Sequence, residues 1–128
     1  MDIRTHLGID RDLCGKPVEL GEGRAVVELA TTKQMATDDR GLVHGGFVFG
    51  LADYAAMLAV NHANVVLAAA ESKFLAPVVT GERVRAEARV VETNGKRSQV
   101  DVEVRRGDTA VFSGSFKCIS LPAHVLER

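Results

Sequence analysis

The sequence has almost no net charge and few aromatic side chains. Its 128 residues carry 16 basic and 17 acidic side chains, and they include no tryptophan and one tyrosine. A nearly neutral chain has no electrostatic reason to bind nucleic acid or an anionic membrane surface. The scarcity of aromatic rings also argues against a platform on which nucleic-acid bases stack. We therefore predict neither nucleic acid nor a membrane as a partner.

Cysteine and long apolar runs are also scarce. Cys14 and Cys118 are the two cysteines, and their spacing fits neither a metal site nor a disulfide framework. The N-terminal residues 1–6 lack the apolar core of a signal peptide, and no uninterrupted apolar run reaches the ~20 residues of a membrane span. We therefore expect a cytoplasmic protein, and we predict no metal and no cofactor.

The chain does contain enough apolar side chains, 46% of its residues, for one hydrophobic core. At 128 residues we expect a single domain over residues 1–128. The apolar residues are densest from Phe47 to Val60, a stretch rich in leucine, alanine and methionine and free of proline. Such a composition predicts a helix that is buried on nearly all sides.

Alternating apolar and polar side chains predict strands on both sides of this helix. One is expected before it at residues 24–31, with the odd-numbered side chains facing the core. The strands expected after it span residues 65–74, 82–92, 97–106 and 109–120. Asn94-Gly95 predicts a tight hairpin, and hairpin connections indicate an antiparallel sheet. Residues 1–20 carry weaker signals, with only a short helix expected near residues 3–8.

These elements together predict the α+β fold class. The sheet would be a curled antiparallel one of five or six strands, wrapped around one long central helix.

One carboxylate, Asp53, lies in the middle of the apolar helix. Buried carboxylates are rare unless hydrogen bonds satisfy them or they serve a function. A carboxylate can accept a proton from water or attack a carbonyl carbon directly. We interpret Asp53 as a catalytic residue, with a satisfied structural aspartate as the alternative.

The predicted helix begins at His44-Gly45-Gly46. A helix N-terminus presents unpaired amides and the positive end of the helix dipole. Gly45 and Gly46 could leave these amides open as an oxyanion hole, or could supply a tight turn that needs positive φ. His44 could contact substrate or only orient the turn. Asn61 and His62, at the other end, are interpreted as caps rather than ligands.

The order of motifs resembles that of the hotdog-fold acyl-CoA thioesterases, most closely the phenylacetic-acid-pathway type. His-Gly-Gly at residues 44–46 opens the helix, and Leu-Ala-Asp follows at 51–53. Phe-Leu-Ala-Pro at residues 74–77 matches the family's Phe-Leu-x-Pro after the next strand. The resemblance covers roughly residues 24–120.

This resemblance implies a homodimer or homotetramer that hydrolyses an acyl- or aryl-acyl-CoA to free acid and CoA. It makes Asp53 the general base or nucleophile, and it assigns the amide that polarises the thioester carbonyl to Gly45 of the partner subunit. Many members carry asparagine where this chain has Asp38, which would place extra negative charge near the site. Gly46, Asp38 and Tyr54 are the remaining candidates for substrate binding.

Two other functions remain open from the sequence. One is a hotdog protein that binds acyl-CoA without turnover, and the less favoured one is a hotdog dehydratase or hydratase, whose different histidine motifs are absent here. Several basic residues could contact the phosphates of CoA, although a solvated basic face is the commoner explanation. These residues are Arg83, Arg85, Arg89, Lys96 and Arg97.

Overall fold

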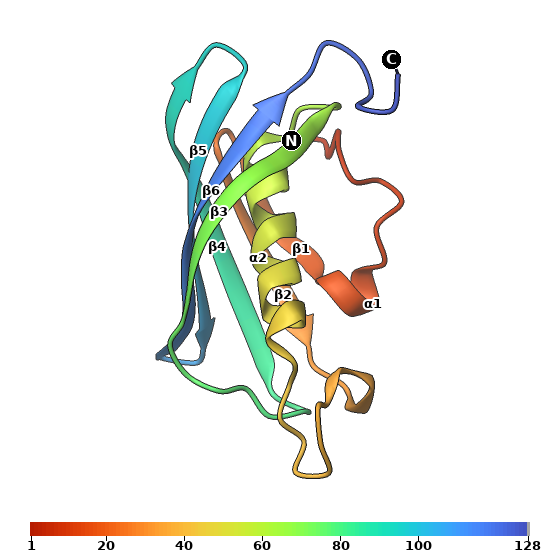
Figure 1. Ribbon diagram of the computed structural model, residues 1–128, viewed down its shortest axis with the longest axis vertical. Helices are drawn as coiled ribbons and strands as arrows, with labels where there is room; N and C mark the ends of the chain where they lie inside the picture. The colour runs from red at the N-terminus through yellow and green to blue at the C-terminus, as the bar shows by residue number, and fades with distance from the viewer. Residues whose placement is uncertain (128) are drawn as a thin grey trace.

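A six-stranded antiparallel sheet curls around one long helix, as predicted (Figure 1). The computed structural model describes residues 1–127. Its helices are α1 (Arg11–Cys14) and α2 (Gly45–Val60), with a 3-10 turn η1 (Lys33–Met35). Its strands are β1 (Lys16–Gly21), β2 (Arg24–Ala30), β3 (Val65–Phe74), β4 (Arg83–Asn94), β5 (Arg97–Arg106) and β6 (Thr109–Ser120). They pair in the order β1-β2-β4-β5-β6-β3, which leaves β1 and β3 at the edges.

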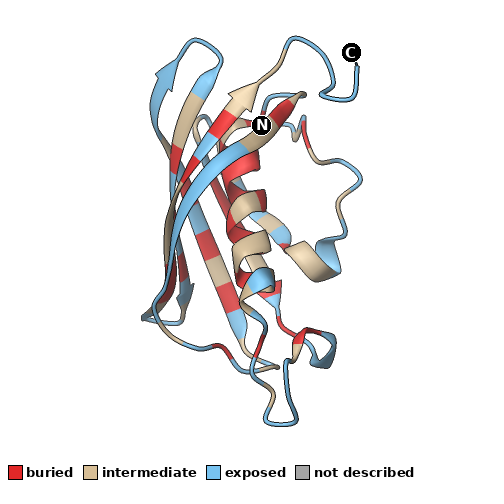
Figure 2. Ribbon diagram, in the orientation of Figure 1, coloured by how far each residue is buried: buried red, intermediate tan, exposed pale blue. Residues whose placement is uncertain are grey.

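The long helix α2 is buried along most of its length (Figure 2). Nine of its sixteen residues are buried, which agrees with the helix expected from its nearly continuous apolar sequence. The helix ends at Asn61, whose left-handed backbone (φ 53°, ψ 41°) lets its N–H donate to the Met57 carbonyl at 2.8 Å. Asparagine tolerates this conformation better than most residues, so the predicted cap is confirmed.

The sheet buries alternate residues against α2. In β5 the buried side chains are Val100, Val102 and Val104, and the residues between them face away from the helix. The strand β2 departs from this alternation, because Val26 is fully buried although it lies on the face that we expected to be exposed to solvent. Among the described residues, no helix is long and apolar enough to cross a membrane.

The first twenty residues differ from the prediction. No helix forms at residues 3–8; the helix α1 lies later, where the Asp10 carboxylate accepts hydrogen bonds from the amides of Asp12 (2.9 Å) and Leu13 (3.2 Å). The strand β1 was missed because Pro17 and a register shift between Pro17 and Glu19 interrupt its pattern. Proline is tolerated there because β1 is an edge strand.

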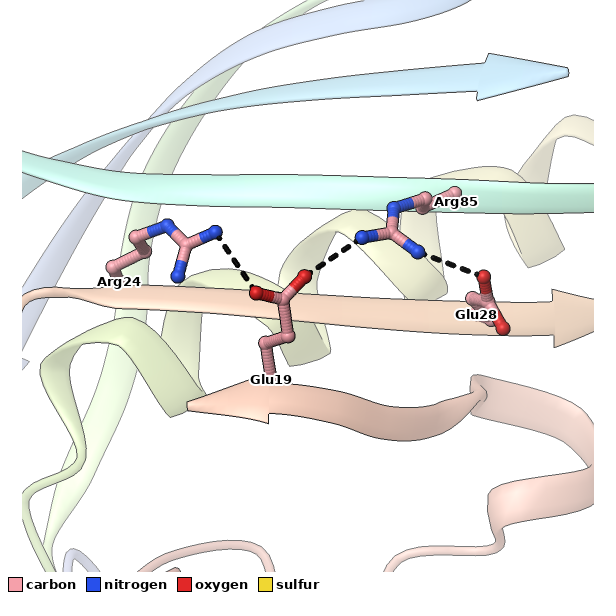
Figure 3. A network of polar contacts seen from close by, with 4 residues as sticks. All are labelled: Glu19, Arg24, Glu28 and Arg85. Carbon is pink, nitrogen blue, oxygen red and sulfur yellow. Dashed lines mark hydrogen bonds and ion pairs between the residues drawn. The ribbon is translucent and has the colours of Figure 1, made fainter. Parts of the chain in front are cut away.

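Ion pairs join the first two strands to β4 on the exposed side of the sheet (Figure 3). Glu19 accepts from Arg24 at 3.3 Å and from Arg85 at 2.8 Å, and Arg85 also donates to Glu28 at 3.0 Å. Such exposed pairs contribute only about 0–1 kcal/mol each. Their consequence for function is that the guanidinium of Arg85, one candidate for CoA phosphates, is already shared between two carboxylates.

Candidate active site

Asp53 lies halfway along α2, between the buried residues Ala52 and Tyr54. Its Oδ1 atom is buried and has no hydrogen-bond partner among the described residues. Burial raises the pKa of Asp53 to about 6, because the charged form is poorly solvated there. A carboxylate with a pKa near neutrality is well matched to accepting a proton under physiological conditions.

Asp53 opens onto a cavity of about 520 Å³. The other walls are the N-terminal residues 4–7, the segment 63–67 that enters β3, Met57, and residues 124–125 near the C-terminus. The walls combine apolar side chains with His6 and the Asp53 carboxylate, as expected of a small-molecule site. Within residues 1–127, no three histidine, cysteine or acidic side chains are grouped closely enough to hold a metal ion.

The start of α2 presents free amides, but not through a turn with positive φ. Gly45 and Gly46 are the first two residues of the helix, and neither has a positive φ. They precede the first i→i−4 bond of the helix, so their amides have no intrahelical acceptor. Our turn explanation for the two glycines is therefore wrong.

The absence of a side chain matters at both glycines because neighbouring rings lie close. A Cβ on Gly45 would lie 3.1 Å from Cε1 of Phe74, and a Cβ on Gly46 would lie 3.0 Å from the imidazole of His44. Phe74 begins the Phe-Leu-x-Pro motif, so that motif packs against the start of the helix. A side chain at either position would have to displace the neighbouring ring.

His44 is the N-cap of α2 and positions the helix start through its backbone. Its N–H donates to the Met35 carbonyl at 2.8 Å, and its carbonyl accepts from Phe47 N–H at 3.0 Å. The ring is exposed and makes no capping hydrogen bond. It contacts Phe47 edge-on, with 6.2 Å between ring centroids. A chemical role for this ring stays a prediction.

Asp38 shapes the loop that leads into α2. Its Oδ1 accepts from the amides of Arg40 at 3.0 Å and Leu42 at 3.2 Å, and the side chain is exposed. An aspartate that bonds nearby amides in this way fixes a turn. The structure thus gives Asp38 a local structural role, and a contact with substrate remains a proposal.

Tyr54 points into the core instead of the cavity. Its side chain is 1% exposed, and burial raises the pKa of its hydroxyl, an effect that the nearby Arg11 side chain partly opposes. The ring lies 6.2 Å from that of His6. This placement favours packing over substrate contact for Tyr54.

The structure does not bring all the predicted residues together within one chain. Asp53 shares its cavity with the N-terminal segment, whereas His44, Gly45 and Asp38 lie toward the opposite end of α2, outside that cavity. Thr5 and His6 on the cavity wall were missed. No periodic pattern marks them, because a long-range contact with the end of α2 places them there.

The chain matches the model of the Thioesterase superfamily over residues 40–113. It is 30% identical to the acyl-coenzyme A thioesterase PaaI of Escherichia coli strain K12 over 120 residues, which covers 86% of this chain and 85% of the relative. The crystal structure of an uncharacterized protein from Pyrococcus horikoshii superposes with a TM-score of 0.98 at 50% identity, covering 99% of this chain and 98% of that one.

Two further relatives are considerably longer than this chain. The chain is 56% identical over 121 residues to the methylthioribose-1-phosphate isomerase of Aquifex aeolicus, which covers 94% of this chain but 26% of the relative. It is 24% identical over 127 residues to the transcription factor FapR of Thermoanaerobacter sp. strain X514, covering 98% of this chain and 62% of that protein. The chain thus spans about a quarter of one relative and under two thirds of the other.

Proposed function

Because this chain belongs to the thioesterase superfamily of hotdog-fold proteins, we propose that it is an acyl-CoA thioesterase. It would hydrolyse an acyl- or aryl-acyl-CoA to the free acid and CoA. The observation that carries the proposal is the Asp53 carboxylate, whose Oδ1 is buried without a partner beside a cavity. A buried acceptor left unpaired disfavours the ionised carboxylate, which raises the pKa of Asp53 and suits it to take up a proton.

In the proposed reaction Asp53 acts as general base. It takes a proton from water as the water oxygen bonds to the thioester carbon, and the carbonyl electrons move onto oxygen. The carbonyl then re-forms, the C–S bond breaks, and the departing sulfur receives the proton from Asp53. The alternative is direct attack by the carboxylate, which gives a mixed anhydride that water then hydrolyses.

The developing oxyanion would be stabilised by the amide of Gly45. Asp53 lies seven residues beyond Gly46 on the same helix, which is about 10 Å at ~1.5 Å per residue. Reacting atoms must approach to about 3–3.5 Å. The amide that serves one chain's Asp53 would therefore come from the partner subunit in a homodimer, with His44 orienting that helix start.

The test is thiol release from a panel of acyl- and aryl-acyl-CoA substrates of different size, followed with a thiol reagent. We expect release by the wild-type protein on at least one substrate. The Asp53→Asn variant, matched in size, should lose that release. No release from any substrate, at substrate concentrations that saturate the protein, would overturn the proposal.

A second candidate is a domain that binds acyl-CoA without turnover. The similarity to the transcription factor FapR favours this function, since nearly all of this chain aligns with part of a regulator. Ligand binding without thiol release, measured by calorimetry on the same panel, would support it. A dehydratase or hydratase would instead alter the acyl chain while leaving the thioester intact, which mass spectrometry would detect.

A further inference from the structure

The N-terminal segment is tied to the end of α2 by the Asn61 side chain. Arg4 N–H donates to Asn61 Oδ1 at 2.8 Å, and Asn61 Nδ2 donates to the Asp2 carbonyl at 2.8 Å. Asn61 itself is buried. In Figure 1 this segment, in red, runs along the side of α2 away from the sheet. These two bonds bring residues 4–7 to the wall of the Asp53 cavity.

His6 is held in an unusual backbone conformation on that wall. Its φ is 54°, one of two positive values among non-glycine residues in the described chain. Such a conformation is uncommon for residues with a side chain and is unfavourable for the backbone. Strained residues of this kind are found preferentially at functional sites.

The ring of His6 is oriented by Thr5, whose side chain is buried. Thr5 Oγ1 lies 2.7 Å from His6 Nδ1, and this is the only hydrogen bond of that hydroxyl within residues 1–127. If Nδ1 carried the proton, the buried hydroxyl hydrogen would have no acceptor, which is unfavourable. The hydroxyl therefore donates to Nδ1, and the ring proton lies on Nε2.

This tautomer leaves an N–H donor free beside the cavity. Nε2 has no hydrogen-bond partner in the part of the chain that the structure describes. Burial lowers the pKa of His6, which favours the neutral ring. Asp53 and His6 line the same cavity without a hydrogen bond between them. A thioester bound in this cavity would therefore have both an acceptor and a donor among the side chains that line it.

We propose that His6 is a second catalytic residue of this cavity, and that its Nε2–H donates a hydrogen bond to the thioester group. This role rests on the proposed thioesterase function. His6 keeps its proton throughout: the water proton moves to Asp53 and then to the departing sulfur, and the His6 N–H stabilises the negative charge that develops on the thioester. Thr5 is a positioning residue that acts through the imidazole.

The test compares two amide replacements, His6→Gln and His6→Asn. The glutamine amide N–H reaches about as far as Nε2, whereas the asparagine amide reaches only the position of Nδ1. Asparagine, however, is the side chain that tolerates a positive φ best. If His6 has only a structural role, the asparagine variant should have the higher kcat. If His6 is catalytic, the glutamine variant should have the higher kcat.

We expect His6→Asn to lose about 10–100-fold in kcat with KM changed less than threefold, the size of effect seen when an oxyanion donor is partly lost. His6→Gln should recover at least half of that loss on a logarithmic scale. A wild-type kcat for His6→Asn, or a kcat that follows only thermal stability across the variants, would overturn the role of His6.

Thr5→Val and Thr5→Ser provide a second test that does not depend on the His6 backbone. Valine fills the same buried space but cannot fix the tautomer of His6, and the fold should be retained. We expect kcat to fall about 3–10-fold, which is less than the loss expected when the His6 donor itself is removed. Serine keeps the hydroxyl and should keep kcat. Equal kcat for the valine and serine variants would contradict the proposal.

The outcomes separate this role from the proposed function. If the wild-type protein releases no thiol from any substrate, both the thioesterase function and the catalytic role of His6 are wrong. If the wild-type protein is active, Asp53→Asn is inactive and His6→Asn keeps full kcat, only the role of His6 is wrong.

Discussion

At the scale of single residues, Asp53 combines a buried, unpartnered oxygen with a pKa raised to about 6. A proton on Asp53 is therefore held more tightly in the folded chain than in the unfolded one, where the pKa is near 3.8. The protonated form stabilises the fold, and this contribution is lost as the pH rises from about 4 to above 6. The ionised Asp53 carboxylate that the proposed reaction needs is thus the form that destabilises the fold.

We predict that Asp53→Asn is more stable than the wild-type protein at pH 7.5 and equally stable near pH 4. The side chain is partly exposed, so the expected gain at pH 7.5 is only about 1–2 kcal/mol. The measurement is urea unfolding of both proteins at several pH values and one protein concentration. If the difference in unfolding free energy between the two proteins does not change with pH, the pKa of Asp53 is not raised in the folded chain.

The same variant should be a poor catalyst. Loss of a general acid–base group lowers rates by about 10²–10⁴-fold, so Asp53→Asn should hydrolyse its best substrate at least 10²-fold more slowly. In the wild-type protein kcat/KM should rise with pH through about 6, as the carboxylate ionises. Near-wild-type turnover by Asp53→Asn would remove Asp53 from the mechanism.

Gly45 offers a second residue-scale prediction, with Gly50 as a matched control on the same helix. A Cβ at Gly45 would meet the Phe74 ring at 3.1 Å beside the free amide, whereas a Cβ at Gly50 meets nothing within 4 Å. Gly45→Ala should lower kcat/KM about tenfold or more, less than the ~10²–10³-fold cost of losing an oxyanion donor outright, because alanine keeps the amide and only crowds it. Gly50→Ala should retain activity and gain about 0.5–1 kcal/mol of stability from helix propensity. Equal activity of the two variants would contradict a role for the Gly45 amide.

Sequence reasoning at this scale finds candidate residues where a local spacing marks them, and it cannot find residues that only a close contact or a distant segment brings to the site. Asp53 and the His-Gly-Gly motif are recognisable from order alone. The reason for Gly45 is the Phe74 ring, which no local pattern reveals. Thr5 and His6 depend on a contact with Asn61, 55 or more residues away.

At the scale of elements, the sequence predicts the long helix α2 and the longer strands better than it predicts the short edge strand β1. The composition of α2 predicts a buried helix, and the strand bounds of β3, β5 and β6 agree with the predicted ranges. The sequence does not predict strand β1, because Pro17 and a bulge interrupt the two-residue period of its side chains. Periodicity thus identifies regular elements, and it fails for short edge strands whose irregularity protects them from pairing.

The C-terminal end of α2 yields a prediction about Asn61. Asn61→Gly keeps the left-handed backbone but loses both side-chain bonds to the N-terminal segment, and should cost about 1–2 kcal/mol. Asn61→Ala also strains the backbone and should cost about 1 kcal/mol more. Urea unfolding measures both. In limited digestion, trypsin should cleave after Arg4 faster in either variant, and unchanged cleavage would show that Asn61 does not hold this segment.

At the scale of the whole molecule, the two sheet edges differ. The strand β1 is short and interrupted by Pro17, which discourages pairing with another chain. The strand β3 has ten residues and no proline, and its second half is exposed. A long exposed edge without proline can pair with a second copy. We therefore predict a homodimer or homotetramer, and light scattering that gives the 13.7 kDa mass of one chain at working concentration would contradict it.

Shared active sites would make this assembly necessary for catalysis, which mixing of inactive subunits can test. Asp53→Asn removes the carboxylate, and Gly45→Pro removes the amide hydrogen at the helix start, where proline is otherwise tolerated. If each site takes Asp53 from one chain and Gly45 from the other, a mixed dimer contains one intact site and one doubly defective site. Each variant alone should therefore be inactive, and the purified mixed dimer should show about half the wild-type activity.

The control for this experiment is a mixed dimer of Asp53→Asn with Asp53→Ala, in which no arrangement of subunits restores a site. It should stay inactive under the same refolding and purification. If the Asp53→Asn and Gly45→Pro dimer, confirmed by native mass, also stays inactive while both variants are folded, the site lies within one chain. Because Gly45 lies eight residues before Asp53, about 12 Å along one α2, Gly45→Pro would then inactivate the protein by disturbing the helix start, and another donor would serve the oxyanion. In that case we expect the His6 N–H, which is already on the wall of the Asp53 cavity, to be that donor.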